Sequence, residues 1–97
     1  MSNRITPALL RAKVKILNDL LGRSAQAYRT ENGRNIATVD TFVLTSAYGG
    51  WSVAEIVSES GGERHAIGMY GHVPARECAS HLDAAIWMAR EFVIRTN

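Results

Sequence analysis

Cysteine and recognisable metal motifs are nearly absent from this sequence. Its 97 residues include one cysteine, Cys78, and three histidines. A single cysteine excludes an internal disulfide and is typical of a reducing compartment, which favours a cytoplasmic location. Neither a Cys-x-x-Cys nor a His-x-x-x-His spacing occurs, so the usual structural zinc motifs are excluded. We expect neither a metal nor another cofactor.

Long hydrophobic runs are also absent. No run approaches the roughly 18 apolar residues that a membrane span requires, and the chain start lacks the apolar segment of a signal peptide. The length favours a single domain over residues 1–97 with one two-layer core. Such a core leaves little room for a deep cavity. We therefore expect no membrane association and no small-molecule substrate.

Charge is modest in total but uneven along the chain. The net charge is +2. Residues 1–34 contain seven cations against two carboxylates, a net charge of +5, whereas the remainder contains four arginines against seven carboxylates, a net charge of −3. This asymmetry can indicate an anionic partner or head-to-tail self-association. It can also arise by chance, because the counts are small.

Two segments have the apolar periodicity of amphipathic helices. In the first, residues 7–21, Thr6 is the N-cap, Pro7 occupies the first helical position and Gly22 ends the helix. Its apolar stripe contains Leu10, Val14, Leu17 and Leu21. Its opposite, solvated face contains Arg11, Lys15, Asn18 and Asp19. The second helix covers residues 74–95, begins at Pro74 and has a buried stripe made of Cys78, Leu82, Ala85, Ala89 and Phe92.

The segment between the helices has the composition of β-strands. Asn32-Gly33 is a strong signal for a two-residue hairpin turn. Runs rich in β-branched and apolar residues follow at 36–45, 51–57 and 64–70, separated by glycine pairs at 49–50 and 61–62. We predict an α+β fold with an N-terminal helix, an antiparallel meander of three to five strands and a C-terminal helix. Both helices are expected on one face of the sheet.

The glycine pair in SAYGGW, residues 46–51, is interpreted as a turn that sets the strand register. With Gly49 and Gly50 as its central residues, the predicted cross-strand pairs are Tyr48 with Trp51, Ser46 with Val53, Leu44 with Glu55 and Phe42 with Val57. One face of this hairpin is strongly apolar and is expected to face the helices. A phosphate-binding loop is disfavoured, because the Lys-Ser/Thr that follows the glycines of a P-loop is missing.

Glu55 is the carboxylate that this register places on the apolar face. Burial there raises its pKa unless a cation of the first helix, such as Lys13, pairs with it; alternatively, the side chain reaches water at an open edge. No second carboxylate, Ser-His-Asp set or Gly-x-Ser-x-Gly motif accompanies it. We therefore predict that the protein is not an enzyme.

The cysteine and the histidines are weak candidates for a chemical site. Cys78 and His81 are neighbours on one helix face, with His72 nearby in the sequence, so a metal site or a reactive thiol is conceivable. Cys78 belongs to the buried stripe, however, where cysteine acts as a small hydrophobic residue. His65 is expected at the surface or at an edge of the sheet.

The strongest interaction signal lies on the back of the last predicted helix. At about 100° per residue, Trp87 and Ile94 fall on one line outside the buried stripe. Aromatic and aliphatic residues flanked by arginines are typical of a protein contact. We predict a protein-binding surface, for a partner or a second copy of the chain, made by Arg76, Asp83, Trp87, Arg90 and Ile94. Alternatively, another segment of the same chain packs over Trp87.

Nucleic-acid binding is the alternative function. The order of helix, three strands and helix resembles that of double-stranded RNA-binding domains, which place a lysine cluster at the start of the last helix. Here that segment, PARECAS at residues 74–80, contains Arg76 with Glu77 beside it, which weighs against that mode. A generic phosphate contact remains open through the basic N-terminal third, at Arg4, Arg11, Lys15, Arg23 and Arg29.

Several strings resemble a group of small phage and prophage proteins. The shared pattern is a first helix ending in Leu-Gly-Arg, a strand ending in Ala-Tyr-Gly-Gly, a glycine-rich turn and a last helix. The matching residues are Leu21, Gly22, Arg23, Ala47, Tyr48, Gly49, Gly50, Gly61 and Gly62. The resemblance spans most of residues 17–90, but this chain departs from it in an Ala- and Trp-rich last helix and in a bare Val73-Pro74 where a Ser/Thr cap is expected.

That group carries no activity to transfer, so the resemblance implies a phage-type origin and a host cytoplasmic location. Together with the surface around Trp87, it leads us to predict a small non-catalytic accessory or host-directed protein. Such a protein binds a protein partner, with a homodimer as one form of this prediction.

Overall fold

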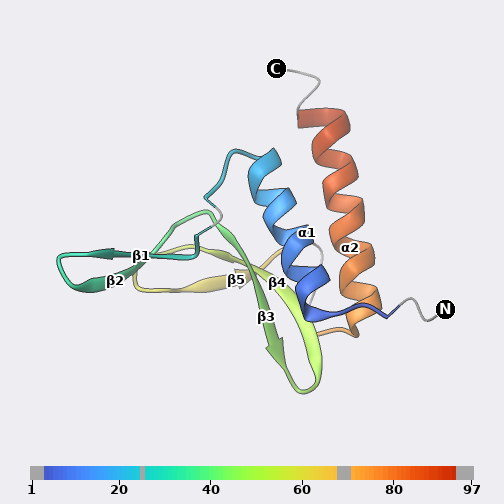
Figure 1. Ribbon diagram of the computed structural model, residues 1–97, viewed down its shortest axis with the longest axis horizontal. Helices are drawn as coiled ribbons and strands as arrows, with labels where there is room; N and C mark the ends of the chain where they lie inside the picture. Colours follow the sequence, from blue (N-terminus) through green and yellow to red (C-terminus); the bar gives the residue numbers. More distant parts are fainter. Residues whose placement is uncertain (1–3, 25, 68–70, 94–97) are drawn as a thin grey trace.

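The computed structural model describes residues 4–24, 26–67 and 71–93 and has the predicted α+β fold (Figure 1). The first helix, α1 (Pro7–Leu20), precedes strands β1 (Tyr28–Glu31), β2 (Arg34–Ala37), β3 (Phe42–Ala47), β4 (Gly50–Ile56) and β5 (Glu63–His65). The last helix, α2 (Ala75–Met88), continues into a π-helical turn, η1 (Ala89–Val93).

These strands form two antiparallel sheets. β1 and β2 make a hairpin that projects from the body, whereas β3, β4 and β5 make a meander in that order (Figure 1). The turn of the first hairpin is Asn32-Gly33, with φ values of 51° and 75°, a left-handed conformation that asparagine and glycine tolerate best. The predicted hairpin and an antiparallel meander are confirmed, but they form separate sheets, and the run predicted at 36–45 is divided between β2 and β3. The last predicted strand, 64–70, is shorter than expected, and its residues 68–70 lie outside the described ranges.

The hairpin of β3 and β4 differs from the prediction by one residue at its turn. Ala47 pairs with Gly50, so Tyr48 and Gly49 are the central residues, with φ values of 54° and 75°. The predicted pairs are therefore wrong, and the observed pairs are Phe42 with Glu55, Leu44 with Val53 and Ser46 with Trp51. Because the turn moves by one residue, each residue of β3 pairs with a β4 residue two positions away from the predicted partner. Side chains alternate between the two faces of a strand, so a shift of two keeps each side chain on its predicted face. Tyr48 is instead fully exposed at the tip.

Gly50 accommodates a close backbone approach rather than the turn. A Cβ atom at this position would lie 3.1 Å from both the carbonyl carbon and the Cβ atom of His72. The backbones are this close because Trp51 and Val73 form a bridge with hydrogen bonds of 2.7 and 2.8 Å. The register thus depends on the segment before α2, which the local pattern of the hairpin does not reveal.

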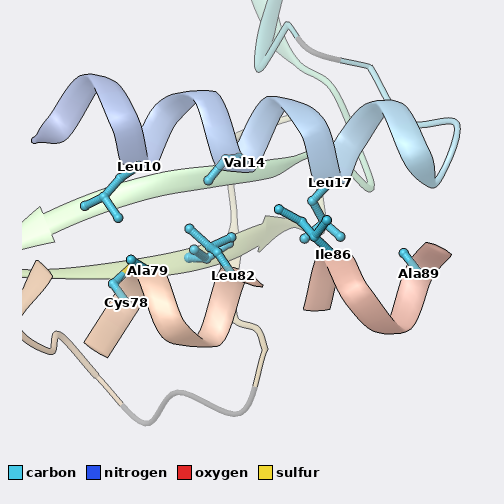
Figure 2. Close-up of a cluster of buried hydrophobic side chains, with 9 residues drawn as sticks. Leu10, Val14, Leu17, Cys78, Ala79, Leu82, Ile86 and Ala89 are labelled. Carbon is cyan, nitrogen blue, oxygen red and sulfur yellow. The ribbon is translucent and has the colours of Figure 1, made fainter. Parts of the chain in front are cut away.

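The two helices lie side by side on one face of the meander, as predicted, and run in the same direction (Figure 1). Figure 2 shows Leu10, Val14 and Leu17 of α1 pointing toward α2, where Cys78, Leu82 and Ile86 follow one another in the same order. The full core cluster consists of Leu10, Val14, Leu17, Val53, Cys78, Ala79, Leu82, Ile86 and Ala89. The core is therefore mainly a helix–helix interface with the sheet beneath it.

The helix ends follow the predicted signals where the structure describes them. The Thr6 hydroxyl accepts a hydrogen bond from the Leu9 N–H at 3.1 Å, as an N-cap does. At the other end of α1, the Arg23 N–H donates to the Asn18 carbonyl at 2.8 Å and the Gly22 N–H donates to the Asp19 carbonyl at 3.2 Å. With Gly22 at φ 70°, this is a Schellman motif. Residues 94 and 95 of the second predicted helix lie outside the described residues.

Asn18 is a correction to the predicted solvated face of α1. It is only 2% exposed. Its amide donates from Nδ2 to the Phe42 carbonyl and accepts at Oδ1 from the Phe42 N–H, both at 3.0 Å. The helical wheel misplaces this residue because β3, rather than solvent, lies against this side of α1.

Candidate protein-binding surface

Three large apolar side chains are exposed together where α2 continues into η1. The exposed fractions are 57% for Trp87, 51% for Met88 and 58% for Phe92. The rings of Trp87 and Phe92 meet edge to face, with centroids 6.1 Å apart and an interplanar angle of 76°. Single exposed apolar residues are normal, whereas a contiguous group is typical of an interaction surface. We call these three residues the apolar patch.

The π-helical turn explains why Phe92 belongs to the apolar patch. In an α-helix, side chains five residues apart point about 140° away from each other, so the helical spacing predicts that Phe92 lies in the buried stripe. η1 spans Ala89–Val93, and its wider turn brings residues five apart toward the same side. The predicted burial of Phe92 is therefore wrong. Such π-helical turns are rare in proteins overall, but those that occur are often found at functional sites.

An apolar hollow of about 310 Å³ lies beside the patch. Every described residue that lines it is apolar, namely Leu17, Leu21, Phe42, Ile67, Ala85, Met88, Ala89 and Phe92. Met88 and Phe92 belong to both features, so the patch and the hollow form one surface. Ile67 reaches it with a φ of 61°, a conformation that is rare for a β-branched residue. Such strain is often retained at functional positions.

The surface predicted from the sequence is only partly assembled. Trp87 is exposed, and Arg76 and Arg90 are exposed on the same helical segment. Asp83 instead forms an ion pair with Lys13 and so turns toward α1. Ile94 lies outside the described residues. Met88 was not predicted, because its only signal in the sequence is its position next to Trp87.

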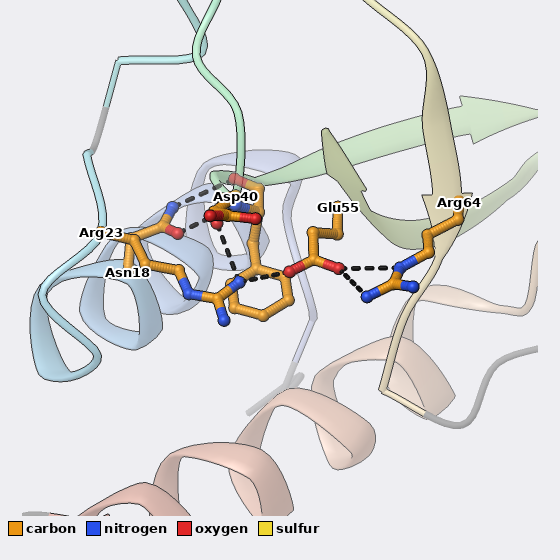
Figure 3. A network of polar contacts seen from close by, with 6 residues as sticks. Asn18, Arg23, Asp40, Glu55 and Arg64 are labelled. Atoms are coloured by element: carbon orange, nitrogen blue, oxygen red, sulfur yellow. Dashed lines mark hydrogen bonds and ion pairs between the residues drawn. The ribbon is translucent and has the colours of Figure 1, made fainter. Parts of the chain in front are cut away.

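Glu55 is buried and paired with two arginines rather than with Lys13. It is 7% exposed. Arg23 donates from Nη1 to Oε2 at 2.6 Å, and Arg64 donates from Nε to Oε1 at 2.8 Å (Figure 3). The hydrogen bonds from Arg23, and then those from Arg64, outweigh the effect of burial and lower the pKa of Glu55. Pairing with a cation was one of the two alternatives that the sequence left open, but neither arginine lies in the first helix, and Lys13 pairs with Asp83 instead. The other alternative, a side chain that reaches water at an open edge, is wrong.

The position of Arg23 follows from the end of α1. Gly22 turns the chain so that the Arg23 guanidinium lies over the Phe42 ring, with Cζ 4.5 Å from the ring centroid. Nη1 also donates to the Asp40 carbonyl at 2.8 Å (Figure 3). The network therefore ties the end of α1 to β4 and β5. A carboxylate that two guanidinium groups hold in its ionised form is a weak base.

The cations proposed for nucleic-acid contact do not form one free basic surface. Lys15 pairs with Asp19 at 2.9 Å, and Arg23 belongs to the Glu55 network. Arg29 lies 3.3 Å from Glu31 and 3.4 Å from Glu59. Arg4 and Arg11 are exposed. Because carboxylates neutralise three of the five predicted cations, the phosphate attraction expected from the sequence is reduced.

The remaining candidates for chemistry lie apart from the apolar patch. Cys78 is fully buried, and burial raises the pKa of its thiol. His65 is exposed on the edge strand β5, as predicted, and its Nδ1 lies 3.2 Å from the Ser52 hydroxyl. His72 lies 3.3 Å from the Thr45 hydroxyl. Among the residues that the structure describes, no three His, Cys, Asp or Glu side chains are placed to hold a metal ion.

Comparison of the chain with protein-family models, with curated proteins and with solved structures finds no match. In the described ranges, neither helix has the length and apolar character that crossing a membrane requires.

Proposed function

We propose that this chain is a non-catalytic protein-binding protein that works as a homodimer through the apolar patch and the adjoining hollow. One observation carries the proposal: Trp87, Met88 and Phe92 are each more than half exposed, and Met88 and Phe92 line a hollow whose described lining is entirely apolar. Association removes such surface from water, which contributes about 25 cal/mol per Å² of apolar area.

A second copy of the chain fits this surface because projections and a hollow occur side by side. In a two-fold interface the same surface of each copy meets the other, so that the projecting side chains of one copy enter the hollow of its partner. None of the described residues that line the hollow is charged, and the centres of homodimer interfaces are likewise depleted in charge. Arg90 is exposed and lies between Met88 and Phe92 in the sequence, so it suits the polar rim of such an interface.

Two further features support binding rather than catalysis. The thiol of Cys78 is buried with a raised pKa, and the carboxylate of Glu55 is occupied by Arg23 and Arg64. The Leu-Gly-Arg and Ala-Tyr-Gly-Gly strings support a phage-type accessory or host-directed role in the host cytoplasm.

Sedimentation of the wild type and of Trp87→Ala tests the homodimer. The wild type is expected to sediment as a dimer at micromolar concentration, and Trp87→Ala as a monomer, because a large aromatic side chain leaves the interface. Tyr48→Ala is the control, since it removes a fully exposed aromatic side chain from the hairpin tip and should leave the dimer intact. A wild type that stays monomeric at several hundred micromolar would contradict the proposal.

A further inference from the structure

The outer edge of β3 has unpaired backbone groups. Residues of an antiparallel strand direct their N–H and C=O groups alternately toward one neighbour and the other. The Thr41 carbonyl accepts from the Ile56 N–H at 3.0 Å, so the backbone groups of Phe42, Leu44 and Ser46 point away from β4. Within the described residues, Phe42 is the one of these three whose backbone has a partner on this side, the amide of Asn18.

The Asn18 amide shows that this edge accepts a peptide-like group. It supplies one donor and one acceptor to the backbone of Phe42, each at 3.0 Å, as a residue of an adjoining strand does. Asn18 also limits the edge, because it occupies the backbone groups of Phe42. The first position open to an added strand is therefore Leu44.

A groove of about 280 Å³ runs beside this edge, between α1 and β3. Its lining consists of Arg11, Val14, Lys15, Asn18, Ala27, Phe42, Val43 and Leu44. Arg11 and Lys15 are both exposed, and none of the described residues that line the groove has a carboxylate. Lys15 shares its charge with Asp19 at 2.9 Å, so Arg11 contributes most of the positive charge. The groove thus combines space, apolar contacts and a positive potential next to open backbone groups.

We propose that this groove binds an extended acidic segment of another protein, which adds to β3 as a further strand. The backbone of the segment exchanges hydrogen bonds with Leu44 and Ser46, and its carboxylates pair chiefly with Arg11, while Lys15 keeps its ion pair with Asp19. Among the described lining residues, Phe42 alone is common to the groove and the apolar hollow. Strand addition is therefore independent of the homodimer.

The charge of the groove decides against a second copy of the chain on this edge. Pairing two β3 edges about a two-fold axis would bring two α1 helices toward each other, each with Arg11 and Lys15 on the groove side. Like charges placed opposite one another at an interface reduce affinity. An acidic segment reverses the sign of this interaction, so it is the favoured occupant.

Amide hydrogen exchange with short synthetic peptides tests the proposal. A peptide of alternating glutamate and valine is expected to slow exchange at Leu44 and Ser46 about tenfold when it saturates the protein. The N–H groups of Val43 and Thr45 point toward β4, so their exchange rates serve as internal references and should change little. A peptide of alternating lysine and valine has the same β-propensity and the opposite charge, and it should give no protection.

Two matched changes test the backbone pairing itself. Ser46→Pro removes an outward N–H group, whereas Ser46→Ala keeps it; we expect about tenfold weaker binding of the acidic peptide to Ser46→Pro and unchanged binding to Ser46→Ala. Methylating the peptide nitrogens gives the same test on the unaltered protein. Methyl groups on the alternate peptide nitrogens that point toward β3 should abolish binding, and methyl groups on the nitrogens that point away from β3 should not.

Unchanged exchange at Leu44 and Ser46 at millimolar acidic peptide would overturn the proposal, as would equal protection by the lysine peptide. Protection that appears without peptide and grows with protein concentration would place a second copy on the edge and would also overturn it. Trp87→Ala should leave peptide binding unchanged whether or not the chain dimerises.

Discussion

The carboxylate of Glu55 lies between the guanidinium groups of Arg23 and Arg64, in a position nearly closed to water (Figure 3). Replacing it by glutamine leaves these two cations without their counter-charge. We expect Glu55→Gln to lower the free energy of unfolding by about 2 kcal/mol, measured by urea denaturation at neutral pH. Glu59→Gln is the control, because it removes the same charge from an exposed ion pair with Arg29 and should cost about 0.5 kcal/mol or less.

The same contacts make stability depend on pH. In the folded chain the pKa of Glu55 lies below its ordinary value of 4.5, so the folded state binds this proton more weakly than the unfolded state does. The stabilisation is therefore complete above the ordinary pKa and is lost as the pH falls through the folded value. The difference in unfolding free energy between wild type and Glu55→Gln should shrink below about pH 4.5. Parallel stability curves down to pH 3 would contradict this assignment.

The side chain of Tyr48 is poorly suited to the backbone conformation at this position. It has a left-handed φ of 54° at the tip of the β3-β4 hairpin, and its side chain is fully exposed. Asparagine tolerates this conformation better than an aromatic residue does. We expect Tyr48→Asn to raise the free energy of unfolding by about 0.5–1 kcal/mol in urea denaturation. Tyr48→Ala removes the same ring without easing the backbone, so an equal gain in both variants would show that the ring, rather than the backbone, is responsible.

At the scale of elements, Asn18 joins α1 to the edge of β3. Replacing it by alanine leaves the partly buried N–H and C=O groups of Phe42 without their partner. We expect Asn18→Ala to cost about 2–3 kcal/mol in unfolding free energy and to speed exchange of the Phe42 amide. Asp19→Ala, one residue further along α1, is the control, since Asp19 is exposed and pairs only with Lys15 among the described residues. Equal losses in the two variants would argue against a specific role for the amide.

The elements themselves could be predicted from sequence, because their signals are local. Thr6-Pro7, Gly22 and Asn32-Gly33 each act within a few residues of the boundary that they set. What could not be predicted depends on distant segments or on non-standard geometry. The register of β3 and β4 depends on the bridge between Trp51 and Val73. Val73 is distant in sequence from the turn.

The candidate site was predictable to the same limited extent. The exposure of Trp87 follows from the α-helical period, which holds as far as Met88. The period fails at η1, so Phe92 was assigned to the wrong side. Met88 carries no periodic signal. The partners of Glu55 were missed because Arg23 reaches it only after the Schellman motif turns the chain across Phe42.

At the scale of the whole molecule, the two surfaces that we propose for interaction lie on different parts of the α1-α2 layer. The apolar hollow lies between the two helices and Phe42, and the basic groove lies between α1 and β3. A dimer formed through the first would leave the second open in both copies. Such an assembly presents two grooves, so a partner that carries two acidic segments would bind with a gain in effective concentration.

Dimerisation also makes thermal stability depend on concentration. A dimer interface stabilises the folded state by mass action, so the Tm of the wild type should rise with protein concentration between the micromolar and millimolar range. Trp87 is 57% exposed in the single chain, so Trp87→Ala should leave the Tm at low concentration nearly unchanged and remove its concentration dependence. Differential scanning calorimetry measures both effects. A Tm of Trp87→Ala that is lower by the same amount at every concentration would instead show that Trp87 stabilises the monomer, and the apolar patch would then be part of the fold rather than an interface.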